Sequence, residues 1–118
     1  MSLVARHLEA AGIPTVVMGS ARDIVEQCGV PRFLYVDFPL GNPCGKPWDQ
    51  AMQYAIAGGA LDLLDKAFAA RTTVQRPEVW DESGSDIWRD RFMRVDDSNR
   101  ATLAREGAAR RLRQQHGQ

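Results

Sequence analysis

The stretch FLYVDFPLGNPCGKP, residues 33–47, decides the fold. It opens with Phe33-Leu34-Tyr35-Val36, an apolar run typical of a buried strand. Two glycines, three prolines and an asparagine follow, and they fix the backbone of a loop because proline restricts φ while glycine permits positive φ. Open α/β sheets bind ligands at the carboxyl ends of their strands. The stretch therefore predicts an α/β fold with a rigid loop placed to bind a ligand.

This loop contains one cysteine, Cys44, whose role the sequence leaves open. Lys46 and a helix expected to start near Trp48 would both lower the pKa of the Cys44 thiol and so favour the reactive thiolate. Three roles fit this position: a redox or nucleophilic group, a packing residue of the loop, or a metal ligand acting together with residues of a partner chain.

Four further residues of the same region are candidate site residues. Asp37, near the end of the predicted strand, is a candidate catalytic base, with a carboxylate that braces the loop as the alternative. Gly41, Asn42 and Gly45 are candidates for cofactor binding because the predicted loop would line a cleft. No cofactor is indicated by the sequence itself.

Arg32 stands at the opposite, amino end of the same strand. A salt bridge with Asp23 or Glu26 of the preceding helix and the binding of an anion are both consistent with it. The two cysteines, Cys28 and Cys44, have no CxxC spacing, so a disulfide framework is not expected.

Composition and charge are those of an ordinary single domain. The chain has 118 residues, of which 44% are hydrophobic and 25% charged. Lys plus Arg and Asp plus Glu each number 15, so no basic excess indicates nucleic acid. No run approaches the roughly 20 apolar residues of a membrane span. We expect a cytoplasmic protein with neither a membrane nor a nucleic-acid partner.

The remaining sequence predicts one βαβ unit with flanking helices. Helices are expected at residues 2–11, 21–27 and 49–70, and strands at 13–18 and 33–38. Parallel strands need neighbours, so two of them make a poor sheet. The chain thus reads as a Rossmann-like half-domain of residues 1–70. Another polypeptide would supply the missing strands, or two copies would complete one another.

A tail of residues 71–118 follows, and it is expected to be extended and helical. Trp80, Trp88 and Phe92 lie there among acids and arginines. Aromatic residues and arginine are enriched at interface cores, so these three are candidate partner-binding residues. The alternative is that they fold back over the sheet of their own chain.

Three pieces of the sequence resemble a known family. They are Glu9–Val16 (EAAGIPTV), Gly29–Arg32 (GVPR) and Phe38–Pro43 (FPLGNP). Their order and separations are similar to those of the B-component proteins of glycine, sarcosine and betaine reductases and the related D-proline reductase subunit. The resemblance implies an oxidoreductase-type, heteromeric enzyme that reductively cleaves a C–N bond.

The chain also departs from that family. Family members carry selenocysteine or cysteine in a UxxC-type motif at the start of the helix that corresponds to Ser2–Ala11, and this sequence has none there. Either a larger catalytic subunit brings the redox thiol or selenol, or its role has moved to Cys44, or the chemistry has been lost. The alternatives to an enzyme subunit are a structural or regulatory subunit and a homodimeric module that binds a small anion.

Overall fold

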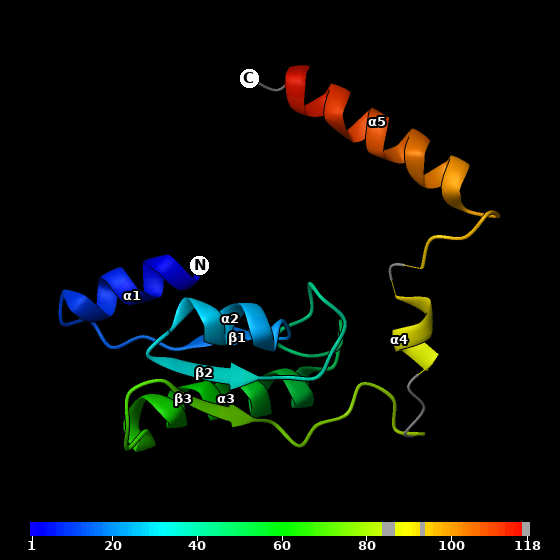
Figure 1. The fold of residues 1–118 in the computed structure, drawn as a ribbon. Helices are drawn as coiled ribbons and strands as arrows, with labels where there is room; N and C mark the ends of the chain where they lie inside the picture. Colours follow the sequence, from blue (N-terminus) through cyan, green and yellow to red (C-terminus); the bar gives the residue numbers. More distant parts are fainter. Residues whose placement is uncertain (84–86, 93, 117–118) are drawn as a thin grey trace. The chain divides into compact units, whose positions relative to one another are not determined.

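The computed structural model describes residues 1–83, 87–92 and 94–116 and divides into two compact units, Met1–Asp86 and Ile87–Gln118 (Figure 1). The first unit contains, in chain order, α1 (Ser2–Ala10), β1 (Val17–Gly19), α2 (Arg22–Cys28), β2 (Arg32–Tyr35), α3 (Gln50–Lys66) and β3 (Thr72–Gln75). The second contains α4 (Ile87–Arg91) and α5 (Arg100–His116). The predicted mixed α/β class with parallel strands is confirmed. The division after residue 70 stays a prediction.

Within the described residues the sheet has three parallel strands in the order β1-β2-β3. β1 pairs with β2 through Val17 and Phe33, and β2 pairs with β3 through Leu34 and Val74. The prediction of a two-stranded sheet was wrong. Thr72–Gln75, for which the sequence indicates only extended backbone, adds the third strand, and its β-branched residues suit that position.

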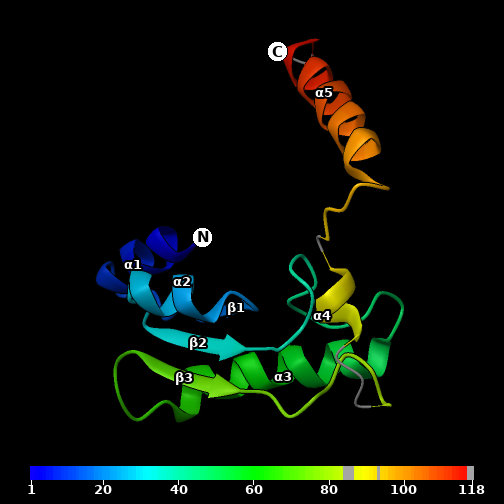
Figure 2. The same cartoon turned by 45° about the vertical axis from the view of Figure 1, so that its right-hand side comes forward.

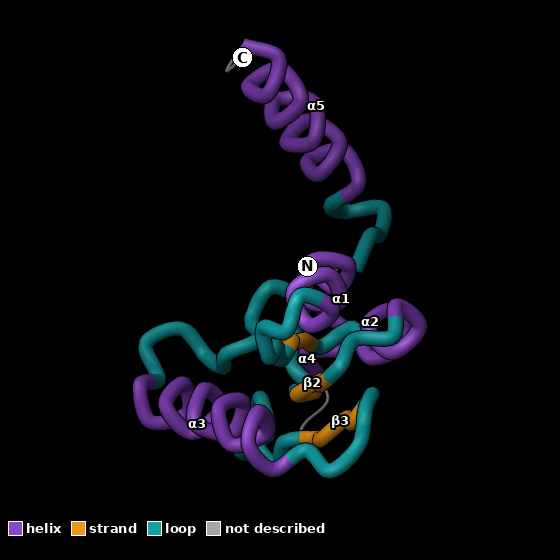
Figure 3. The backbone as a smooth tube through the Cα atoms, turned by 90° about the vertical axis from the view of Figure 1, so that its left-hand side faces the viewer, coloured by secondary structure: helices purple, strands orange, loops and turns teal. Residues whose placement is uncertain are grey.

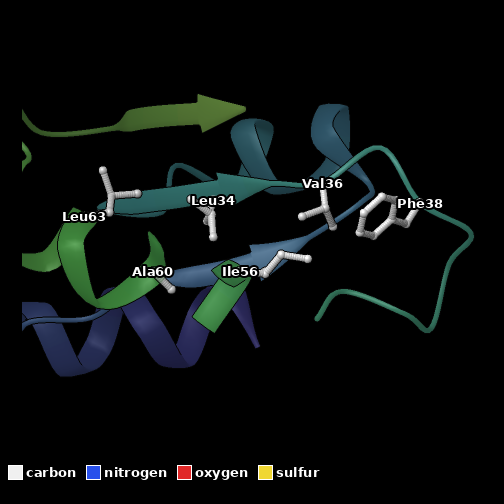
Figure 4. Close-up of a cluster of buried hydrophobic side chains, with 6 residues drawn as sticks. All are labelled: Leu34, Val36, Phe38, Ile56, Ala60 and Leu63. Carbon is white, nitrogen blue, oxygen red and sulfur yellow. The ribbon is translucent and has the colours of Figure 1, made fainter. Parts of the chain in front are cut away.

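Each face of the sheet is covered by one helix. On one face, α3 packs against β2 and the start of the following loop (Figure 4), in a core of Leu34, Val36, Phe38, Ile56, Ala60 and Leu63. On the other face, Val25 of α2 packs with Val30 and Phe33. Since neighbouring side chains of a strand point to opposite faces, α2 and α3 lie on opposite sides of the sheet (Figure 3).

Helix α3 has a well-defined start and end. The Asp49 side chain caps it by accepting a hydrogen bond of 3.0 Å from the Met52 main-chain N–H. It ends at Lys66, because Ala67 is extended with ψ of 115°. The helix is therefore shorter than predicted, and the chain turns back after it so that β3 can run beside β2 (Figure 2).

The second unit is helical in its described part. The rings of Trp88 and Phe92 meet edge to face with their centroids 6.4 Å apart, and the Arg89 guanidinium lies 4.6 Å from the centre of the Trp88 ring.

Among the described residues, no helix is both long and apolar enough to cross a membrane.

Candidate functional site

The candidate site lies at the carboxyl ends of β1 and β2. From there the chain continues after β1 into α2 and after β2 into α3, on opposite faces of the sheet. Connections that leave neighbouring strands for opposite faces open a crevice between them, which is where open α/β sheets bind ligands. The loop after β2, residues 36–49, includes the loop predicted from the sequence, residues 38–47, and extends beyond the tip of β2 (Figures 1 and 2).

A series of turns braces this loop. The main-chain N–H of Asn42 donates to the Pro39 carbonyl at 3.1 Å, and that of Gly45 donates to the Asn42 carbonyl at 3.3 Å. The Gln53 side-chain amide, on α3, donates to the Lys46 carbonyl at 2.8 Å. These bonds hold one backbone path, as the glycine and proline content of the stretch indicates.

Both glycines of the loop have positive φ but differ in their surroundings. Gly41 has φ of 95° and open space where a Cβ would stand. Gly45 has φ of 107°, is buried, and a Cβ there would lie 2.9 Å from Cγ of Met52 and 3.4 Å from Cδ1 of Ile56. Gly45 is thus required both by the turn and by the packing of α3 against the loop.

Cys44 is half-buried and directed towards α3. Its Sγ donates a weak hydrogen bond to the Gln53 carbonyl at 3.7 Å. The described residues include no group of three or more His, Cys, Asp or Glu side chains arranged to hold a metal ion. A metal at Cys44 would therefore need ligands from elsewhere.

Asp37 is half-buried just past the end of β2. The Tyr35 hydroxyl donates to Asp37 Oδ1 at 3.2 Å, and the Arg22 guanidinium lies 5.6 Å from the centre of the Tyr35 ring. The hydrogen bond ties the Asp37 carboxylate to a side chain of β2. The catalytic role of Asp37 stays a prediction.

An apolar pocket of about 310 Å³ lies beside the loop. Its walls come from α1, through Val4, Ala5 and Leu8, from Met18 of β1, and from Pro43 of the loop. The sequence did not indicate this pocket, because its walls meet only after α1 folds beside β1. The amphipathic pattern of the first helix was the one available signal.

The candidate partner-binding aromatics fall into two groups. Trp80, in the first unit, is half-buried against Phe38 of the core with ring centroids 5.5 Å apart, which favours the alternative that it covers its own sheet. Trp88 and Phe92 belong to the second unit and contact each other. Partner binding by all three stays a prediction.

The salt bridge expected of Arg32 exists, but the predicted partners were wrong. Arg32 Nη1 donates to Oε1 of Glu9, on α1, at 2.8 Å, at the amino end of the sheet and away from the loop. The hydrogen bond from Arg32 lowers the pKa of Glu9, burial opposes this, and the Thr15 main-chain N–H and hydroxyl add to the lowering.

Replacing Glu9 by glutamine should make the stability of the protein less dependent on pH. Because the pKa of Glu9 is lower when folded than when unfolded, its contribution is present above the unfolded value and disappears as pH falls through the folded value. We expect Glu9→Gln to lower the free energy of unfolding by about 1 kcal/mol at pH 7. Urea titrations from pH 7 to pH 3 should show the difference from wild type shrinking towards zero.

The control is Asp62→Asn, which breaks an exposed pair with Lys66 whose side chains are 65% and 73% accessible. Such a pair contributes little, so the loss should stay below about 0.5 kcal/mol. An equal effect of both substitutions at neutral pH would contradict the role assigned to Glu9.

Comparison with known proteins gives one informative similarity. The chain is 33% identical over 75 residues to D-proline reductase subunit gamma of Acetoanaerobium sticklandii. The matched stretch is 64% of this chain but 31% of that protein, so the chain spans about a third of the relative's length. No family model matches the chain, and no solved structure matches it.

Proposed function

We propose that this chain is a small subunit of a reductase-type, heteromeric enzyme related to the glycine, sarcosine, betaine and D-proline reductases. The observation that carries this is the similarity to D-proline reductase subunit gamma over 64% of the chain. The small parallel sheet supports it, since a Rossmann-like domain normally has more strands on either side. A larger catalytic subunit would supply those strands and the redox thiol or selenol.

In this proposal the loop after β2 forms one wall of a cleft shared with the larger subunit. Cys44 and Asp37 are the side chains that this chain would contribute to the chemistry, and Gly41, Asn42 and Gly45 would line the bound ligand. The proposed reaction is reductive cleavage of a C–N bond, which consumes two electrons and two protons. A dithiol reductant would provide both and be oxidised to a disulfide.

A second candidate function is that of a structural subunit that stabilises the catalytic partner. The contact between Cys44 Sγ and the Gln53 carbonyl favours it, because this contact directs the side chain towards the backbone of α3. In that case Cys44 contributes only to the packing of the loop on α3.

The substitution Cys44→Ser separates the two functions. The complex is isolated through a tag on this chain, and product formation from D-proline, glycine, sarcosine and betaine is measured with added dithiol. If Cys44 takes part in the chemistry, the complex should assemble normally and lose turnover by at least ~100-fold, or about 2.7 kcal/mol of transition-state stabilisation. Cys28→Ser, at the end of α2, is the matched control and should retain full turnover.

Unchanged assembly and turnover in Cys44→Ser would support the structural subunit. A complex that turns over none of these substrates, whatever the residue at position 44, would contradict the proposed reaction.

A further inference from the structure

Helix α3 is apolar on two opposite faces. Ile56, Ala60 and Leu63 pack on the sheet. On the other side of the helix, Tyr54 is 80% and Leu61 67% exposed. Large apolar side chains that lie exposed together on one helix face suit contact with another protein surface. The outer face of α3 therefore has the composition of an interface.

The exposed apolar residues are spaced evenly about the middle of the helix. Tyr54 and Leu61 lie about one turn to either side of Ala57 and Gly58. When a second copy of the helix runs antiparallel across this midpoint, Tyr54 meets Leu61 of the partner subunit. Leu61 in turn meets Tyr54 of the partner subunit, so the two contacts are identical. Such a surface is self-complementary, as a two-fold symmetric interface requires.

The residues that flank the two ends of α3 would be paired by the same two-fold symmetry. Trp48 precedes α3 and is 95% exposed, and Phe68 follows it and is 94% exposed. Antiparallel pairing brings each end of α3 beside the opposite end of its copy, so Trp48 lies near Phe68 of the partner subunit. Asp65 then lies near Gln50 of the partner subunit, so the Asp65 carboxylates of the two copies are kept apart.

Gly58 stands where the two helices would cross. A Cβ at Gly58 would meet nothing within 4 Å, so the packing of its own chain does not require glycine there. Glycine inside a helix is destabilising relative to alanine. Two helices that cross at Gly58 can bring their backbones close together, because glycine has no side chain.

The exposed area is sufficient for a stable dimer. An aromatic side chain contributes about 150–250 Å² when buried, so Trp48, Tyr54, Phe68 and Leu61 together offer roughly 600 Å² per copy. Two copies would bury roughly 1,200 Å² before any flanking atoms are counted, the lower limit of standard interfaces.

From these observations we propose that the protein forms a two-fold symmetric homodimer through the outer face of α3, with the helices antiparallel and crossing at Ala57–Gly58. The dimer uses a different surface from the loop after β2. It is independent of the proposed function, because it rests only on α3 and its two flanking aromatics.

Sedimentation equilibrium on the full chain from 1 to 200 μM tests this. Wild type should sediment with twice the 13.1 kDa mass of one chain. Gly58→Gln and Leu61→Glu should each raise the dimer dissociation constant by at least ~100-fold. Gly58→Gln should also keep the helical circular dichroism spectrum of wild type, because glutamine favours the helix more than glycine does, so its loss of dimer cannot be attributed to unfolding.

The matched control is Ile24→Glu, which places a charge on the exposed side of α2, where Ile24 is 62% exposed. It should remain dimeric. A wild-type monomer up to 200 μM would overturn the proposal, and so would a dimer that persists in both α3 variants, as expected of pairing through the edges of the sheet.

The orientation has its own test. A mixture of Tyr54→Cys and Leu61→Cys proteins should form a mixed disulfide faster than either protein alone forms its own. Faster linkage of like variants would mean that the helices are parallel and would overturn the antiparallel arrangement.

Discussion

Replacing Ile56 by alanine should lower the free energy of unfolding by about 4 kcal/mol. Ile56 has no exposed surface and lies between α3 and the sheet, among side chains of β2 and the loop that follows it. Its loss removes apolar contacts and leaves a cavity that the surrounding core can fill only in part. Urea unfolding followed by circular dichroism measures the change directly.

Ile24→Ala is the matched control, because it makes the same change in another helix of the first unit, at a side chain that is 62% exposed. Its cost should be below about 1 kcal/mol, since little apolar area is removed from contact. Similar losses in the two variants would mean that α3 is not packed on the sheet as the structure has it.

A second large loss is expected when Gly45 becomes alanine, and it should exceed the loss for Gly41→Ala. Both substitutions put a side chain on a backbone with positive φ, which costs about 1–2 kcal/mol. Only at Gly45 does the new Cβ also meet Met52 and Ile56, and overpacking adds about 1–3 kcal/mol. Gly45→Ala should therefore lose about 3–4 kcal/mol in the same unfolding assay.

The difference between the two glycine variants isolates the contact with α3 from the strain of the turn. Equal losses would show that the loop moves away from α3 without cost. In that case the bracing of the loop would come from its turns alone.

The sequence predicted the parts of the fold that local patterns determine. The predicted strands exist but are shorter, since β1 covers Val17–Gly19 instead of 13–18 and β2 covers Arg32–Tyr35 instead of 33–38. The glycines and prolines after β2 form a braced loop, and the helices begin close to their predicted starts. β3 could not be predicted, because extended backbone becomes a strand only when α3 returns the chain to β2.

The sequence also could not predict which face of the sheet each helix covers. Right-handed crossovers are strongly preferred and would place both helices on one face of a sheet with this strand order. The structure has α2 and α3 on opposite faces, so one of the two crossovers is left-handed (Figure 3).

At the candidate site, residue types were predicted but contacts were not. Proline and glycine spacing indicated a fixed loop, whereas the direction of Cys44 depends on where Gln53 of α3 lies. Glu9 was missed as the partner of Arg32 because the two residues meet only through the packing of α1 beside the sheet.

The third strand has a consequence for the order in which the sheet assembles. β2 pairs with β1 across roughly 16 positions and with β3 across roughly 40, so closing the second pairing costs about 0.8 kcal/mol more chain entropy. Proteins dominated by contacts distant in sequence fold more slowly at similar stability. We therefore expect β3, the strand that leads along the chain to the second unit, to join the sheet after β1 and β2 have paired.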